Sequence, residues 1–131
     1  MVILDTDILV GLLRNNQEAA LKIEELEQKG IPVCTTVISS YELFKGVFLS
    51  SNPVRNAVSV MELLDSITIL HFDFDASKIS AKVYSNLKKQ GAITNVMDQM
   101  IASVAISQNQ ALITRNTKHY ENIRGIAIEN W

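Results

Sequence analysis

Short apolar runs alternate with longer amphipathic stretches along the whole chain. Five runs of β-branched and other apolar residues have the length of strands: residues 2–4, 33–36, 67–70, 111–114 and 126–128. Between them apolar positions recur at helical spacing, which predicts helices at about 5–13, 16–29, 38–49, 53–65, 76–90 and 95–109. This alternation is typical of an α/β fold with a parallel sheet, helices on both faces and right-handed crossovers.

Polar residues, proline and glycine mark the predicted helix ends. Asn15 or Asn16 is expected to cap the second helix, and Asn52 is followed by a proline suited to the first helical position. Asp75 is expected to cap the helix that Gly91 ends. No linker, repeat or low-complexity segment interrupts the pattern, and 131 residues fit one domain, so we predict a single domain over 1–131.

Composition indicates the size of the core and the cellular compartment of this domain. Apolar residues make up 47% of the chain, enough for a sizeable core. The single cysteine, Cys34, excludes an intrachain disulfide and fits a reducing cytoplasm. No apolar run approaches the ~18 residues that span a bilayer. The first residues lack the basic and apolar regions of an export signal, so a cytoplasmic protein without a membrane segment is expected.

Charge is distributed unevenly. Residues 1–75 carry five Lys/Arg and eleven Asp/Glu, a balance of −6, whereas residues 76–131 carry seven and three, a balance of +4. The basic part suits a polyanion, although lysines on helix surfaces are also commonly just solvated. The mean hydropathy of +0.14 leaves room for an apolar surface that binds another protein.

Three acidic residues interrupt apolar runs, which is unusual for carboxylates. Asp5 ends the first predicted strand, whereas Glu42 and Asp98 lie in apolar helical segments. Carboxylates are seldom buried unless they are paired or bound to a metal. All three positions are compatible with the edge where the carboxyl ends of parallel strands meet. Carboxylates gathered there need a cation, and hard divalent cations such as Mg²⁺ take oxygen ligands.

Each acidic residue also has a structural interpretation. Asp5 suits a helix N-cap, Glu42 alone is an ordinary solvated helix residue, and Asp98 suits the dipole of its helix. Asp7 fits a second ligand, a helix-dipole acid or a partner of the first turn, and we assign it, with Thr6, an accessory role. The metal-site hypothesis therefore depends on the three acids acting together.

Further polar candidates follow the fourth strand and the second. Thr114 and Asn116 offer oxygens that can ligate a metal or hold water, with Thr114 assigned as accessory. Arg115, Lys118 and Lys45 are candidates for contacts to phosphate, although each is also an ordinary surface residue. The chain has no glycine-rich phosphate loop, CxxC, HExxH or Ser/His/Asp pattern.

Four segments, taken in order, resemble the motifs of PIN-domain nucleases, particularly VapC-type toxins. They are Val2-Ile3-Leu4-Asp5-Thr6-Asp7-Ile8-Leu9, Ser40-Tyr41-Glu42-Leu43-Phe44-Lys45-Gly46, Asp98-Gln99-Met100-Ile101-Ala102, and Leu112-Ile113-Thr114-Arg115-Asn116 followed by His119-Tyr120. The last seven residues, 125–131, also resemble the C-terminal segment of these proteins. The resemblance runs essentially end to end and implies one three-layer PIN-like domain with a central, mostly parallel five-stranded sheet.

The resemblance implies a metal-dependent endoribonuclease. Asp5, Glu42, Asp98 and Asn116 would be catalytic and would hold Mg²⁺ or Mn²⁺. Asn116 stands where the family often has Asp, which weakens the expectation of a second metal; Asp7 stands where it often has Asn. The expected reaction is hydrolysis of an RNA phosphodiester that leaves a 5′ phosphate and a 3′ hydroxyl, with the basic C-terminal part holding the RNA backbone.

A toxin role implies a cognate VapB-like antitoxin and, as is common in the family, a homodimer. The antitoxin segment would lie in an apolar groove between the helices at 8–29 and 37–64 and block the site with a basic side chain. The candidate lining is Leu12, Leu13, Tyr41, Phe44 and Phe48, although core packing explains most of them equally well.

Three other functions remain open. A PIN nuclease that matures RNA, and a PIN domain that only binds RNA or a partner, would share this pattern. Asp5-x-Asp7 after a first strand also resembles haloacid-dehalogenase-type phosphatases, in which the first Asp is a nucleophile and the second a general acid. Leu9 stands where that motif has Thr, and the chain is short for that fold.

Overall fold

The computed structural model describes all 131 residues. The elements are, in order, β1 (Val2–Leu4), α1 (Thr6–Leu13), α2 (Gln17–Gln28), β2 (Val33–Thr36), α3 (Val37–Leu49), α4 (Pro53–Asp65), β3 (Thr68–Leu70), α5 (Phe74–Gln90), α6 (Val96–Gln108), β4 (Ala111–Ile113), the 3₁₀ turn η1 (Thr117–His119) and β5 (Ile128–Glu129). The predicted alternation of strands and helices is confirmed.

All five strands form one parallel sheet in the order β3-β2-β1-β4-β5. β1 lies at its centre, where Leu4 is in register with Ile113 of β4. The chain first builds outward from β1 to β3, then crosses back to β4 on the other side. The order of the strands therefore reverses next to β1, and in open α/β sheets ligands bind at the carboxyl ends of the strands beside such a reversal.

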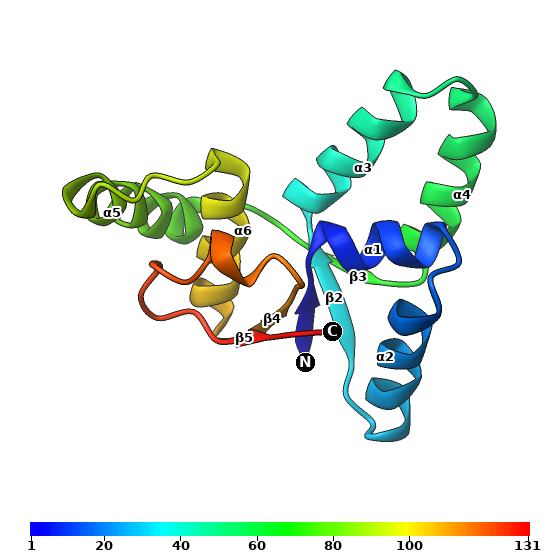
Figure 1. The fold of residues 1–131 in the computed structure, drawn as a ribbon, viewed down its shortest axis with the longest axis horizontal. Helices are drawn as coiled ribbons and strands as arrows, with labels where there is room; N and C mark the ends of the chain where they lie inside the picture. Colours follow the sequence, from blue (N-terminus) through cyan, green and yellow to red (C-terminus); the bar gives the residue numbers. More distant parts are fainter.

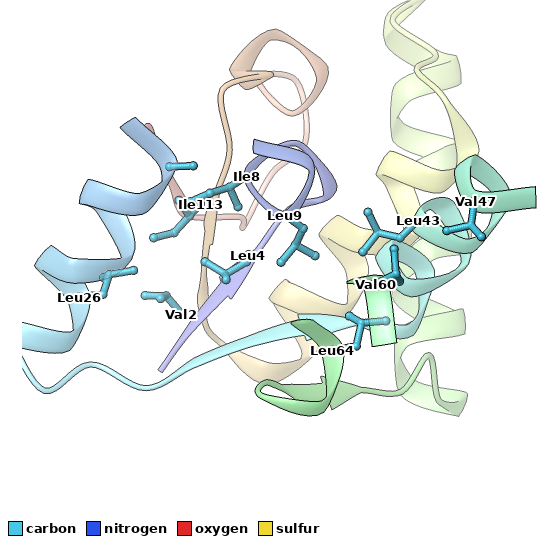
Figure 2. Packing of buried hydrophobic residues seen from close by; sticks show 11 residues of the cluster. Val2, Leu4, Ile8, Leu9, Leu26, Leu43, Val47, Val60, Leu64 and Ile113 are labelled. Atoms are coloured by element: carbon cyan, nitrogen blue, oxygen red, sulfur yellow. The ribbon is translucent and has the colours of Figure 1, made fainter. Parts of the chain in front are cut away.

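Helices cover both faces of the sheet, as predicted. Figure 1 shows α1–α4 on one side and α5 with α6 on the other. Successive strand residues point to opposite faces, so Val2 and Leu4 belong to the core against α1–α4, shown in Figure 2. Ile3 belongs to the second core, which packs against α5 and α6. The three-layer arrangement holds the end of β1 between two apolar cores.

A few predicted boundaries were wrong. Asp73, not Asp75, caps α5: its Oδ1 accepts a hydrogen bond of 2.9 Å from the amide of Ala76. Asp75 lies in the first turn of α5, where its negative charge still interacts favourably with the helix dipole. The last strand is Ile128–Glu129 rather than 126–128, because the residues paired with β4 are Ile128, opposite Leu112, and Glu129, opposite Ile113.

Other ends differ by a residue or two. Asn16 caps α2, and Asn15 instead takes a left-handed conformation with φ of 57° in the turn before it. β3 begins at Thr68 rather than at residue 67, and β4 ends at Ile113, before Thr114. None of the helices combines the length and apolarity needed to cross a bilayer.

An acidic site at the carboxyl edge of the sheet

Asp5 is the most deeply buried of the acidic residues. It directly follows β1 and caps α1, with Oδ1 accepting a hydrogen bond of 2.7 Å from the amide of Thr6. Its Oδ2 accepts from the hydroxyls of Thr114, at 2.7 Å, and Tyr120, at 2.9 Å. Burial raises the pKa of Asp5 to about 6, although these hydrogen bonds oppose the shift and the nearby Asp7 adds to it. Capping explains the contact of Oδ1, and no Lys, Arg or His side chain forms an ion pair with this buried carboxyl group.

Asp7 joins the ends of two strands and the last residue of the chain. Its Oδ2 accepts hydrogen bonds from the amide of Arg115, at 2.7 Å, and from the hydroxyl of Thr114, at 3.2 Å. Its Oδ1 accepts from the indole Nε1 of Trp131 at 3.2 Å. Both carboxylate oxygens thus link α1 to neighbouring segments, which gives Asp7 a structural role, and the accessory role predicted for it stays a prediction.

Glu42 reaches the site from the second turn of α3. Its Oε1 accepts a hydrogen bond of 2.7 Å from the hydroxyl of Thr6, the residue after Asp5. α3 begins directly after β2 and lies beside α1. The accessory role predicted for Thr6 stays a prediction, and the contact shows how such a role would work: Thr6 holds the carboxylate of Glu42 next to the cap of α1.

Asp98 reaches the site from the other side of the sheet, in the first turn of α6. Its Oδ2 lies 3.0 Å from Nδ1 of His119, and its Oδ1 lies 3.5 Å from the hydroxyl of Tyr120. Burial raises the pKa of Asp98, against the lowering effect of His119. Asp98 therefore meets Asp5 through the same hydroxyl group, and three acids from distant parts of the sequence lie in one small region.

Tyr120 lies at the centre of this region. The residue is 1% exposed, and its ring packs in the second core with residues such as Ile3 and Leu112. Burial, together with the charges of Asp5 and Asp98, raises the pKa of the Tyr120 phenol. The hydroxyl thus keeps its proton and remains a hydrogen-bond donor to the carboxylates.

The side chains of Asn116, Arg115, Lys45 and Lys118 form no hydrogen bond or salt bridge with the three acids. The backbone amide of Asn116, however, donates a hydrogen bond of 3.0 Å to the hydroxyl of Thr114, which itself contacts Asp5. The side chain of Asn116 is exposed and forms no hydrogen bond. The guanidinium of Arg115 forms an ion pair with Glu18 and stacks on the ring of Trp131, with Cζ 3.6 Å from the ring centroid. Lys45 lies over the ring of Tyr41, and Lys118 is exposed. The cation of Arg115 is therefore already engaged within the protein.

The donor chemistry of the site fits a hard divalent cation. Asp5, Glu42 and Asp98 supply carboxylate oxygens, the ligands that Mg²⁺ takes. No three His, Cys, Asp or Glu side chains converge closely enough to hold an ion as they stand. Glu42 is held by Thr6 and Asp98 by His119. A cation would therefore require these two carboxylates to turn toward Asp5, and it would offset the buried charge there.

Sequence reasoning missed the roles of two aromatic residues. Tyr120 is the one large apolar side chain in the polar run 115–122, a signal that predicts burial but not the direction of its hydroxyl. The sequence around Trp131 does not predict its role, because its contact with Asp7 joins residues 124 positions apart. His119, which follows the phosphate-binding candidate Lys118 in the sequence, pairs with Asp98.

A groove of about 320 Å³ lies beside Glu42, between α1, α3 and α4. Its lining includes Val10, Leu13, Val47, Val60 and the charged Arg14. Of the residues predicted to line such a groove, only Leu13 does so. The others have different places: Leu12 and Phe44 pack against the first core, and Tyr41 and Phe48 are exposed on α3.

Comparison with known proteins gives a match over nearly the whole chain. Residues 2–125 match the family model of the PIN domain. The chain is also 28% identical over 128 residues to the tRNA(fMet)-specific endonuclease VapC of Shigella flexneri, a match that covers 98% of this chain and 96% of that protein.

Solved structures share the fold closely. The crystal structure of VapBC2 from Rickettsia felis, bound to a DNA fragment from their promoter, matches with a TM-score of 0.92 and 27% identity and covers 100% of this chain and 99% of that one. The structure of VapBC-5 from Mycobacterium tuberculosis, described as a member of the VapBC family of toxin-antitoxin systems, matches with a TM-score of 0.69 and 27% identity, over 98% and 95% of the two chains.

Proposed function

The chain belongs to the PIN-domain family, and from this premise we propose that it is a metal-dependent endoribonuclease, the toxin of a VapBC-type toxin–antitoxin pair. It would act in the cytoplasm, where the expected RNA substrates and the antitoxin are found. Relatives named as endonucleases and ribonucleases match 98% of the chain, which supports the activity. A solved toxin–antitoxin structure of the same fold supports the role.

One observation carries the catalytic part of this proposal. Asp5 and Asp98 come from opposite faces of the sheet and are 93 positions apart, yet both contact the hydroxyl of Tyr120. Glu42 joins them through Thr6, the neighbour of Asp5. Gathering three carboxylates in one region raises the free energy of the folded chain unless a cation is bound. The proposal explains why this fold gathers them.

In this proposal Asp5, Glu42 and Asp98 hold one Mg²⁺ or Mn²⁺ ion. A bound divalent cation supplies Lewis-acid chemistry, because it acidifies water and offsets the negative charge that builds on a scissile phosphate. Asp5 contributes the fixed ligand, since its Oδ1 and Oδ2 are already oriented by three hydrogen bonds. Asn116 remains a proposed ligand of lesser weight, because its side chain is exposed and neutral.

RNA is the proposed substrate. The Shigella flexneri relative is named as an endonuclease specific for tRNA(fMet), so tRNA is the first substrate class to test. Lys45 and Lys118 stay candidates for contacts to the RNA backbone, since neither forms a salt bridge. Arg115 is a weaker candidate, because binding phosphate would compete with its ion pair to Glu18.

The groove beside Glu42 is the proposed antitoxin site. It is lined by apolar side chains from α1, α3 and α4 and also by Glu42. An antitoxin segment with apolar side chains and one basic side chain would match both features, and the basic group would neutralise Glu42 and compete with the metal. A homodimer is also proposed, with exposed apolar residues of α3 and α4 available for it: Phe48, Leu49, Val54, Val58 and Met61.

The alternative phosphatase function finds no support in the geometry. In that mechanism Asp7 would be a general acid with a free carboxyl group facing the substrate. Both oxygens of Asp7 instead accept hydrogen bonds from residues of the protein. The nuclease proposal is therefore the one that the site favours.

Cleavage of a tRNA and rRNA-fragment panel tests the proposal. Purified wild-type protein is compared with Asp98→Asn, with or without EDTA, in Mg²⁺ or Mn²⁺. Asp65→Asn is the matched control, because Asp65 is exposed on α4 and forms no ion pair. We expect cleavage by the wild type and the control only, with a 5′ phosphate and a 3′ hydroxyl on the products.

The other outcomes are equally informative. Cleavage that survives Asp98→Asn would show that the site is misplaced or that a contaminant acts. A wild-type protein that binds the cation and RNA without cleaving any of the panel would favour a PIN domain that only binds. Cleavage confined to precursor RNAs would favour a role in RNA maturation.

A further inference from the structure

We infer that Tyr120 is a positioning residue, whose buried hydroxyl keeps the carboxylates of Asp5 and Asp98 close to each other for the binding of a divalent cation. The inference rests on the proposed metal-dependent function and adds a residue that supplies no ligand of its own. Two observations support it: the place of the Tyr120 ring in the core, and the contacts of its hydroxyl with the two carboxylates.

The ring of Tyr120 is fixed in place by the core rather than by the site. It belongs to the second core, which also contains Val83 and Leu87 of α5 and Ile101 of α6. Its backbone is fixed as well, since its amide donates a hydrogen bond of 3.1 Å to the carbonyl of Thr117, the first residue of η1. The hydroxyl is therefore presented to the acids from a rigid base.

The hydroxyl lies between two carboxylates that come from different layers of the fold. It donates to Oδ2 of Asp5 at 2.9 Å and lies 3.5 Å from Oδ1 of Asp98. Thr114 also donates to Asp5, but its second carboxylate contact is with Asp7. Tyr120 is thus the one hydroxyl that contacts both of these proposed ligands.

The remaining contacts of the two carboxylates explain why one hydroxyl matters. Oδ1 of Asp5 is oriented by the amide of Thr6, and Oδ2 of Asp98 by His119. The facing oxygens, Oδ2 of Asp5 and Oδ1 of Asp98, share the Tyr120 hydroxyl. Groups that hydrogen-bond to metal ligands fix ligand orientation, and losing one typically weakens metal binding by about 10–100-fold.

Calorimetric titration of metal-free protein with Mn²⁺ tests the inference. Tyr120→Phe removes the hydroxyl and keeps the ring in the core. Tyr84→Phe is the matched control, because Tyr84 is half-exposed on α5 and forms no side-chain hydrogen bond. We expect the Kd for Mn²⁺ to rise about tenfold in Tyr120→Phe and to stay at the wild-type value in Tyr84→Phe.

A second measurement separates positioning from stability. Titrations are run well below the thermal midpoint of each variant in EDTA, so that only folded protein is measured. Raising the Mn²⁺ concentration should restore most of the kcat of Tyr120→Phe. Because a cation also stabilises the folded state of any variant that binds it, this recovery is measured only where Tyr120→Phe is already fully folded in EDTA. A Kd within twofold of the wild-type value in Tyr120→Phe would overturn the inference.

The binding measurements distinguish a failure of this inference from a failure of the proposed function. If the wild-type protein itself binds no Mn²⁺, the metal-dependent function fails and the inference falls with it. If the wild type binds Mn²⁺, Asp98→Asn does not, and Tyr120→Phe binds like the wild type, only the role of Tyr120 is overturned.

Discussion

The indole Nε1 of Trp131 donates a hydrogen bond of 3.2 Å to Oδ1 of Asp7, joining the two ends of the described chain. The guanidinium of Arg115 stacks on the same indole ring. The ring also lies close to Gly11 of α1, where an added Cβ would be 3.1 Å from it. Asp7 in turn accepts from the amide of Arg115. Asp7 thus ties α1, the end of β4 and the last residue together beside the acidic site.

Asp7→Asn should reduce stability more than it reduces metal binding. An amide has only one acceptor oxygen, so its NH₂ group would face the amide of Arg115 or the indole of Trp131, both of which are donors. Leaving such a donor unpaired costs about 1–3 kcal/mol. Urea unfolding in EDTA measures the loss, with Asp65→Asn as the control. A large loss of Mn²⁺ affinity without a loss of stability would instead make Asp7 a ligand.

Glu42→Gln should separate the charge of Glu42 from its hydrogen bond. A glutamine oxygen can still accept from the hydroxyl of Thr6, which Glu42 does at 2.7 Å. The fold of α1 against α3 should therefore be kept, whereas Mn²⁺ affinity and cleavage should each fall by at least about tenfold. Glu62→Gln is the control, since Glu62 is exposed on α4. Wild-type metal binding in Glu42→Gln would remove Glu42 from the proposed site.

The sheet and its helices could be predicted because they depend on local patterns. The apolar run before Asp5 and the helical spacing around Asp98 are visible in any short window of the sequence. Caps are harder to assign, because several residues near one helix end compete. Asp73 and Asp75 both suit the start of α5, and only the hydrogen bond from Ala76 decides between them.

The detail of the site depends on contacts that sequence patterns do not encode. Arg115 follows a strand in the manner of a phosphate-binding residue, but Glu18 and Trp131 engage its guanidinium from segments remote in sequence. Tyr120 follows a polar turn, and only its place in the second core, which residues of α5 and α6 help to form, directs the hydroxyl to Asp5 and away from solvent. Such pairings appear only when the layers are assembled.

Cys34 should be unreactive in the folded protein. The residue is buried in the second core, and its thiol donates to the carbonyl of Val2 at 3.2 Å. Burial raises the pKa of Cys34 to about 11 from its ordinary value of 9.0. A raised pKa contributes stability that is complete below about pH 9 and is lost as pH rises toward 11. A disulfide reagent at pH 8 should label the protein only in urea. Rapid labelling of folded protein would show that the core opens locally.

We predict that the RNA backbone crosses a basic hollow on the face opposite the proposed antitoxin groove. It has a volume of about 430 Å³ and is lined by α5, α6 and the segment before β5. Lys82 and Arg124 line it together with Asn86, and no acidic residue does. Neither cation forms a salt bridge, so both charges are available to phosphate.

Replacing both cations, Lys82→Ala with Arg124→Ala, should weaken tRNA binding and reduce its salt dependence. Each phosphate contact contributes about 0.7–0.9 to the slope of log K against log salt concentration, so losing two should reduce the slope by about 1.4–1.8. Binding is measured in EDTA, which prevents metal-dependent cleavage. Lys29→Ala with Arg55→Ala removes the same charge from the opposite face of the sheet and should leave the slope nearly unchanged. Equal slopes in the two double variants would show that the RNA does not cross the basic hollow, because the loss would then follow net charge rather than position.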